Sequence, residues 1–183
     1  MPHADWNVVI TTETGAEAFH RVRKQLAVFG HLERTDYWNV LVLRVDDVHQ
    51  FLESVHGLAT DDRAFASAIS RVMPVTETFN FQSPEAFEEH ACRIASHWLP
   101  HLRQASFHVR MHRRGFKGRL SSQHEERFLD HFIVDALRAE QSDARIDFDD
   151  PDYILAVESV GQRAGMSLWN RDHLQRYRLL KLD

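Results

Sequence analysis

The amino-acid sequence predicts an α+β protein in two parts, residues 1–82 and 83–183. In some stretches apolar residues recur at every second position, which is typical of half-buried strands. In others they recur at three- and four-residue spacing, which is typical of helices. Between the two parts, helix-start signals accumulate at Ser83-Pro84-Glu85: a capping serine, a proline in the first turn and an acid near the positive end of the helix dipole. We therefore place a domain boundary before Ser83.

The first part is predicted to follow the order βαββαβ, since strand-like and helix-like patterns alternate in that order. Gly15 opens the first helical pattern and Gly30 closes it. The predicted elements are a strand over 6–11, a helix over 15–29, strands over 32–37 and 38–45, helical stretches from Asp46 or Asp47 and over 65–72, and a strand over 75–81. This order indicates a small ferredoxin-like domain.

The second part is predicted to contain two long helices and several strands. The first helix begins after Ser83 and ends or kinks at Pro100. The second begins at Ser122-x-x-Glu125, the spacing of a capping box, and continues with a clear apolar stripe. Three short strands are expected after it, over residues 145–148, 153–159 and 166–169. The second part is therefore α+β as well.

A strand is predicted between these two helices, from Ser106 to His112. Phe107, Val109 and Met111 alternate there with His108, Arg110 and His112. Since successive side chains of a strand point to opposite faces, one face is expected to be dry and the other cationic.

The charge of the chain is unevenly distributed. The net charge is −5, from 22 basic and 27 acidic residues. One stretch, from Arg103 to Arg119, holds basic residues and no acid. Those residues are Arg103, Arg110, Arg113, Arg114, Lys117 and Arg119. An acidic protein attracts a polyanion only where its positive charge is concentrated, so this stretch is the candidate nucleic-acid contact.

The loop after the predicted strand has the features of a phosphate site. Gly115 and Gly118 permit backbone conformations that other residues avoid. The helix that follows presents free backbone N–H groups and the positive end of its dipole. Phe116 could stack on an unpaired base or pack into the core, and the basic loop could equally be ordinary solvated surface. The sequence leaves these alternatives open.

The order of short motifs over residues 84–170 resembles that of a THUMP domain. The motifs are the run from Ser106 to Gly115, Ser121-Ser122, the run from Ile146 to Asp152, and Val157-Glu158. The resemblance implies an N-terminal ferredoxin-like domain, no catalytic domain, and binding of the tRNA acceptor stem and 3′ end as an adaptor for a separate modifying enzyme. It also implies that Asp147, Pro151 and Asp152 shape a turn. The residues expected to contact RNA are Arg110, His112, Arg113, Arg114, Phe116, Lys117, Arg119, Ser121 and Ser122.

No catalytic, cofactor or metal motif is recognised in the sequence. Gly-x-Gly-x-x-Gly after a strand, a Walker loop and Gly-x-Ser-x-Gly do not occur. His108 and His112 would lie roughly 13 Å apart on a strand. His124 and His131 would lie about 10 Å apart on a helix, without a carboxylate set to complete a site. We expect no enzyme activity, no cofactor and no metal, and Cys92 is interpreted as a small buried hydrophobe.

Location and partners follow from the same patterns. No apolar run is long enough for a membrane span, and residues 1–5 do not resemble a leader, so a cytoplasmic protein is expected. The main alternative to RNA binding is a protein-interaction module that uses Trp169, Tyr177 and Leu179-Leu180. A small hydrolase with histidine chemistry is the third hypothesis. For the RNA-binding hypothesis, removal of charge at Arg110, Arg113 and Arg114 is expected to weaken RNA binding with little effect on stability.

Overall fold

The computed structural model describes residues 5–182 and divides the chain into two compact units. The first unit consists of the chain up to Thr76 together with Leu174–Lys181. The second consists of Glu77–His173 together with Leu182. Residues 1–4 lie outside the described residues. They make up most of the stretch on which the expectation of no leader rests.

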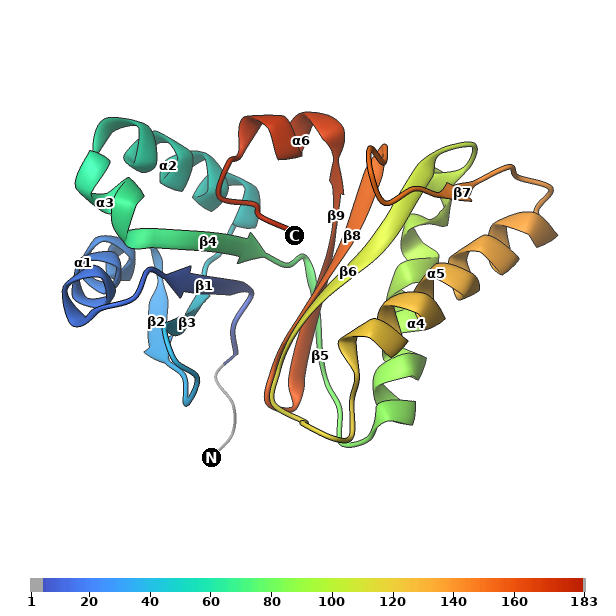
Figure 1. The fold of residues 1–183 in the computed structure, drawn as a ribbon, viewed down its shortest axis with the longest axis horizontal. Coiled ribbons are helices and arrows are strands. Elements are labelled where there is room, and N and C mark those ends of the chain that lie inside the picture. The colour runs from blue at the N-terminus through green and yellow to red at the C-terminus, as the bar shows by residue number, and fades with distance from the viewer. Residues whose placement is uncertain (1–4, 183) are drawn as a thin grey trace. The chain divides into compact units, whose positions relative to one another are not determined.

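The first unit is a four-stranded antiparallel sheet with helices packed against it (Figure 1). The strands lie in the order β2-β3-β1-β4. A core cluster forms between sheet and helices, and Val8, Leu26, Leu43 and Phe65 are fully buried in it. The elements are β1 Val8–Thr12, α1 Ala16–Leu26, a 3-10 turn Ala27–Phe29, β2 His31–Arg34, β3 Val40–Arg44, α2 Val48–Asp61, α3 Arg63–Ala68 and β4 Ile69–Pro74. The predicted element order βαββαβ is confirmed, with two helices, α2 and α3, before the last strand.

The last strand of this unit lies earlier in the chain than predicted. The sequence pattern indicated a helix over 65–72 and a strand over 75–81, whereas β4 spans Ile69–Pro74. The side chain of Asp62 accepts hydrogen bonds from the amides of Ala64 and Phe65 and starts the short helix α3, which ends at Ala68. The apolar residues that follow pair with β1, with Ile10 opposite Val72.

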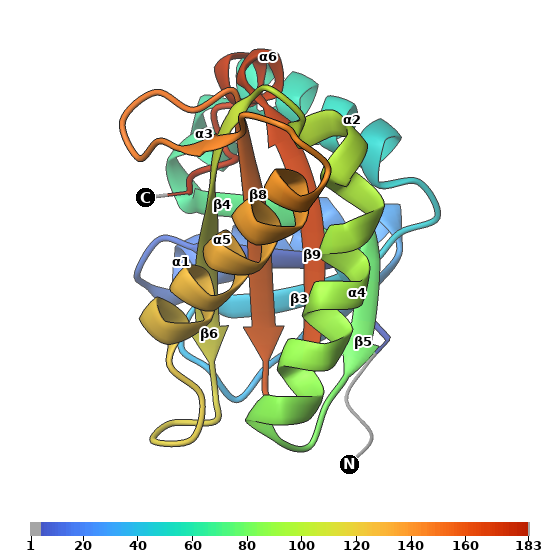
Figure 2. The same cartoon turned by 90° about the vertical axis from the view of Figure 1, so that its right-hand side faces the viewer.

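The second unit is a five-stranded sheet with α4 and α5 on one face (Figure 2). The strand order is β5-β9-β8-β6-β7; β6 runs parallel to β7 and β8, and the other pairs are antiparallel. Phe87, Phe107, Leu129 and Leu155 are fully buried in its core. The elements are β5 Glu77–Asn80, α4 Pro84–Leu102, β6 Ser106–Arg114, α5 Ser122–Ala139, β7 Arg145–Ile146, β8 Tyr153–Val160, β9 Arg163–Asn170 and α6 Arg171–Arg176.

The ends of this unit also differ from the sequence-based boundary at 82/83. Glu77–Asn80 pair with β9, opposite residues 163–166, so the second unit begins six residues before the predicted boundary. Leu174–Lys181, expected as a tail of the second part, belongs to the first unit. There the amide of Val72 donates to the carbonyl of Leu179 at 3.0 Å. Both differences arise from pairing over long sequence separations.

Helix α4 matches the prediction at its start and differs at its end. The hydroxyl of Ser83 accepts a hydrogen bond from the amide of Ala86, with Pro84 in the first turn. Pro100 lies inside the helix, which ends at Leu102. The predicted strand over 106–112 extends to Arg114.

The edge of β6 is closed by side chains of α5. Strand β7 pairs only with Ser106 and Phe107 of β6. Further along, the amide of Val109 donates to Oδ1 of Asp130 at 2.9 Å, and the amide of Met111 donates to Oε1 of Glu126 at 2.8 Å. The helix carboxylates therefore take the place of a neighbouring strand.

Burial of Asp130 makes stability depend on pH. Burial raises the pKa of this carboxyl to about 7, above its ordinary value of 3.8. Since the unfolded chain releases this proton first, stability falls as pH rises from about 4 to about 7. The variant Asp130→Asn has a neutral side chain that can still accept from the amide of Val109. We expect its free energy of unfolding to fall less between about pH 5 and pH 8 than that of the wild type, by about 2 kcal/mol. Urea unfolding at the two pH values measures this, and equal losses in the two proteins would contradict it.

Candidate nucleic-acid interface

The basic segment, residues 103–119, lies within the second unit and runs from the end of α4 through β6 into the loop before α5. Its first member, Arg103, pairs with Glu140 at 2.9 Å. The hydroxyl of Ser121 accepts a hydrogen bond from the amide of His124 at 3.3 Å and caps the helix. Ser122 is the first helical residue, so Ser121 caps the helix and the predicted capping box Ser122-x-x-Glu125 is not formed. The backbone of Ser121 is extended (φ −114, ψ 118), and the residue before it, Leu120, is buried. The helix therefore begins directly after Ser121, one residue earlier than predicted.

The loop between β6 and α5 depends on its glycines. Gly115 (φ 96) and Gly118 (φ 79) both have positive φ, as the sequence suggested. Phe116 between them also has a positive φ of 52. The amides of Arg119 and Leu120 both donate to the carbonyl of Phe116 at 3.0 Å, which makes the loop a tight turn.

Phe116 packs against the protein, the less specific of its two predicted roles. Its ring centroid lies 5.1 Å from that of Phe81, and the guanidinium of Arg119 lies 4.6 Å from the ring centroid. The half-buried ring adjoins the core of the second unit. The structure therefore supports the core role and not base stacking for this side chain.

The charge of Arg114 is held by a buried carboxylate. Its Nη1 lies 2.8 Å from Oε2 of Glu158, which is fully buried on β8. His112 Nδ1 lies 3.5 Å from the other oxygen of the same carboxylate. This geometry argues against the expectation that charge removal at Arg114 would leave stability unchanged, because the buried Glu158 would lose a cationic partner.

Three other arginines of the segment are bonded to neutral groups. Arg110 Nε donates to the carbonyl of Leu182 at 2.8 Å. Arg113 Nη1 donates to the carbonyl of Gly115, and Arg119 Nη2 to that of Gln82 at 3.3 Å. A carbonyl orients a guanidinium without neutralising it, so these residues, together with the exposed Lys117, retain positive charge for a phosphate.

The outer face of β6 is less polar than its sequence suggested. His108, expected on the cationic face, is 7% exposed. Burial is the main cause that lowers its pKa from the ordinary value. Its ring lies 5.5 Å from that of Phe148, which is 70% exposed in the loop after β7. His108 is thus not a phosphate contact, and Phe148 is an exposed aromatic that the sequence reasoning missed.

The acidic loop before β8 is structural, as the sequence resemblance implied. Asp147 Oδ1 accepts from the amides of Asp149 and Asp150. Asp152 Oδ2 accepts from the amide and hydroxyl of Ser106, and these bonds lower the pKa of its carboxyl. Both carboxylates therefore fix the path of the loop.

The first unit carries a second exposed aromatic, Trp38, which is 80% exposed. It borders a hollow of about 520 Å³ that Arg23 and Arg34 also line. Trp38 was predicted to lie in a strand, but β3 begins at Val40, and Asn39 has a positive φ of 57. The turn-forming residues Asp36 and Asn39 on either side were the signal that Trp38 lies in a turn.

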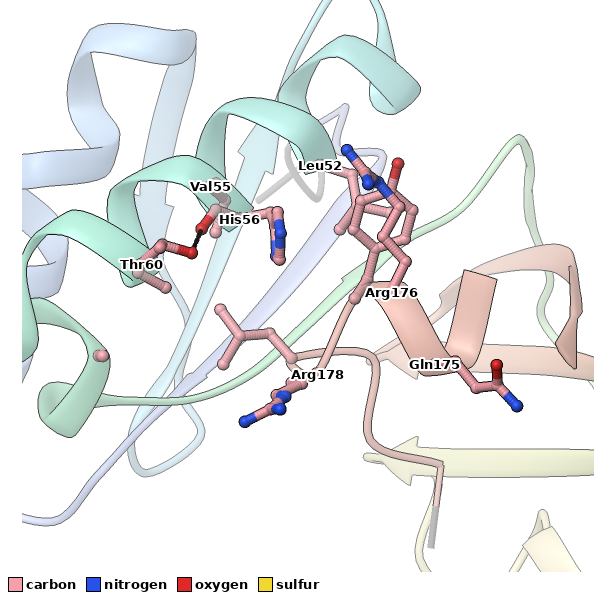
Figure 3. Close-up of a pocket in the computed structure, with 11 residues that line it drawn as sticks. Leu52, Val55, His56, Thr60, Gln175, Arg176 and Arg178 are labelled. Atoms are coloured by element: carbon pink, nitrogen blue, oxygen red, sulfur yellow. Dashed lines mark hydrogen bonds between the residues drawn. The ribbon is translucent and has the colours of Figure 1, made fainter. Parts of the chain in front are cut away.

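A larger hollow of about 600 Å³ lies between α2 and Leu174–Lys181 in the first unit (Figure 3). His56 and Arg176 line it. Arg176 and Tyr177 both donate to the carboxylate of Glu53, and these bonds lower the pKa of Glu53 to about 2. The Arg176–Glu53 ion pair and the hydrogen bond from the Tyr177 hydroxyl to Glu53 hold residues 174–181 against α2.

The residues proposed for the protein-interaction alternative are largely internal. Trp169 is 1%, Tyr177 9% and Leu180 5% exposed. These buried side chains leave little apolar surface for a partner.

Within the described residues, no helix is both long enough and apolar enough to cross a membrane.

No protein-family model and no curated protein matches this chain. Several solved structures share its fold. PH1313 from Pyrococcus horikoshii Ot3 matches with 11% identity and a TM-score of 0.58, over 89% of this chain and 54% of that one. TrmN from Thermus thermophilus matches with 17% identity and a TM-score of 0.60, over 89% and 44%. A 4-thiouridine synthetase in complex with RNA and ATP matches with 12% identity and a TM-score of 0.54, over 91% and 42%.

The chain thus spans about half of the length of these structures or less. At such low identity the likeness concerns the fold. It supports the α+β class predicted from the sequence, and the fold of this chain is THUMP-like.

Proposed function

We propose that this protein binds RNA through the basic segment of its second unit, and that the RNA is the acceptor stem and unpaired 3′ end of tRNA. The observation that carries the proposal is the state of the cations on an otherwise acidic chain. Arg110, Arg113 and Arg119 are oriented by neutral carbonyls, and Lys117 is exposed beside them. Their positive charge is therefore available to phosphates.

The start of α5 adds a second attraction for phosphate. The first amides of a helix have no partner within the helix, and the helix dipole is positive there. The Ser121 hydroxyl is engaged in the cap, so Ser121 contributes by positioning this turn. The amides of Ser122 and Gln123 are the groups that we assign to a phosphate oxygen.

The unpaired bases need flat partners, and Phe116 is occupied by Phe81 and Arg119. Phe148, which lies in the second unit with the basic segment, is exposed enough to stack on a base. We assign base stacking to this residue.

We further propose that the protein carries out no catalytic step and presents its RNA to a separate modifying enzyme. This part rests on the resemblance to stand-alone THUMP proteins. A pull-down with nuclease treatment tests it: recovery of a modifying enzyme that depends on RNA supports the adaptor role. Recovery of a partner that survives RNA removal would favour the protein-interaction module instead.

The RNA-binding proposal predicts a strong dependence on salt and on the 3′ end. With about four to six phosphate contacts, affinity should fall about a hundredfold to a thousandfold between about 50 and 200 mM salt. Removal of the unpaired 3′ end should weaken binding further, because the stacking contacts are lost. Titration of labelled tRNA with and without its 3′ end measures both effects. Equal and salt-insensitive affinities would refute the proposal.

A further inference from the structure

Three metal-ligating side chains meet between α4 and α5 in the second unit. Glu88 lies on α4, and His124 and Glu125 lie in the first turn of α5. One ligand atom from each side chain lies within 4.8 Å of the other two. The two helices lie side by side on the same face of the sheet (Figure 2). The sequence analysis paired His124 only with His131 on its own helix; the carboxylates come from its neighbour Glu125 and from α4.

Glu125 gives an independent indication of a missing partner. The residue is 2% exposed, and its Oε2 is buried without a hydrogen-bond partner among the described residues. A buried carboxylate oxygen without a donor or a cation is costly, and native proteins contain few of them. Next to it, His124 Nε2 lies 3.4 Å from Glu88 Oε1. A cation bound here would satisfy the carboxylates of both acids.

We propose that Glu88, His124 and Glu125 bind a divalent transition-metal ion of the Zn²⁺ class. Ligands at about 2.0–2.1 Å from a tetrahedral Zn²⁺ lie about 3.4 Å from each other. The His124 and Glu88 atoms already have this separation, and the ligand atom of Glu125 lies within 4.8 Å of both. An imidazole in the set favours Zn²⁺ over Mg²⁺ or Ca²⁺, which prefer oxygen ligands.

The charges and the exposure of the group fit such an ion. Two carboxylates balance a divalent cation, and the neutral imidazole supplies the third ligand. The side chain of His124 is 66% exposed, so a water molecule can occupy the fourth position. Cys92, one turn after Glu88, is outside the group. Burial, together with the charges of Glu88 and Glu125, raises the pKa of its thiol to about 11.

A proton is the competing occupant of this group. Burial and the nearby Glu88 carboxylate raise the pKa of Glu125 to about 7. A proton shared between the two carboxyl groups would also reduce their repulsion. Measurement of zinc binding separates the two occupants, because the proton-bearing pair alone gives no saturable binding of Zn²⁺.

The test is calorimetric titration of the chelator-treated, dialysed protein with ZnCl₂ in the absence of RNA. We expect one ion per chain and a higher melting temperature with Zn²⁺. Glu88→Gln, His124→Gln and Glu125→Gln should each weaken binding at least about tenfold. Glu88 and His124 are partly exposed, so their variants are informative even if Glu125→Gln fails to fold. MgCl₂ should give no saturable binding.

Matched controls lie on the same helices. Glu89→Gln on α4 and His131→Gln on α5 change the same residue types at exposed positions and should leave the zinc affinity unchanged. Absence of saturable Zn²⁺ binding would overturn the proposal. So would equal effects of the ligand and control variants. Neither result depends on RNA, so failure here leaves the proposed function intact.

Discussion

Substitution Arg114→Ala is expected to destabilise the second unit by about 3–5 kcal/mol. The Arg114 guanidinium lies 2.8 Å from the carboxylate of Glu158, which is fully buried on β8. Truncation leaves that carboxylate inside the unit without the guanidinium, while His112 Nδ1 stays 3.5 Å from its other oxygen. An exposed ion pair would contribute about 1 kcal/mol or less. The position of Arg114 on β6 beside β8 therefore makes it structural.

Urea unfolding of three variants tests this expectation. Arg114→Ala should shift the transition strongly, and the double variant Arg114→Met with Glu158→Gln should recover much of the loss, because no charge is then left buried. Arg103→Ala is the matched control, since Arg103 pairs with Glu140 on the surface at 2.9 Å. A loss for Arg114→Ala as small as that for Arg103→Ala would show that the buried pair has no special weight.

The second large effect is expected on RNA affinity. The triple variant Arg110→Gln, Lys117→Gln and Arg119→Gln should bind tRNA on the order of a hundredfold more weakly at low salt. Arg110 and Arg119 donate to neutral carbonyls and Lys117 is exposed, so their positive charge is available to phosphates. The slope of log affinity against log salt should also fall by about one for each phosphate contact that is lost. Electrophoretic or fluorescence titration over a range of salt concentrations measures both quantities.

The control for this triple variant removes the same charge elsewhere. Lys24→Gln, Arg63→Gln and Arg138→Gln change three exposed basic residues outside the segment. Their affinity should stay within a few-fold of the wild type, and the melting temperatures of both triple variants should remain close to it. An equal loss in both triple variants would mean that binding follows net charge and has no defined site.

The sequence predicted elements well where local signals agree. The cap at Ser83 and the apolar stripe of α5 each reside in one segment of chain, and both helices start within one residue of their predicted positions. Residues 69–81 are apolar or alternating almost throughout, so periodicity alone could not separate β4 from β5. What divides them is pairing with β1 and with β9, which lie far away in the sequence.

The candidate site was predictable as a cluster but not as a set of roles. Arg110, Arg113 and Arg114 read alike in the sequence. Arg114 pairs with a buried carboxylate, whereas Arg110 and Arg113 donate to carbonyls. Strand register and the path of the chain determine these partners. Glu88 and His124 are likewise 36 positions apart in the numbering and meet only because α4 and α5 pack together.

The carboxylates of Asp130 and Glu126 also affect how the molecule behaves at high concentration. By accepting from the amides of Val109 and Met111, they make these two donors of β6 unavailable to another chain. Unsatisfied strand edges promote aggregation by recruiting foreign strands. Because α5 occupies these two amides, we expect it to reduce the tendency of β6 to pair with a strand of another copy of this protein.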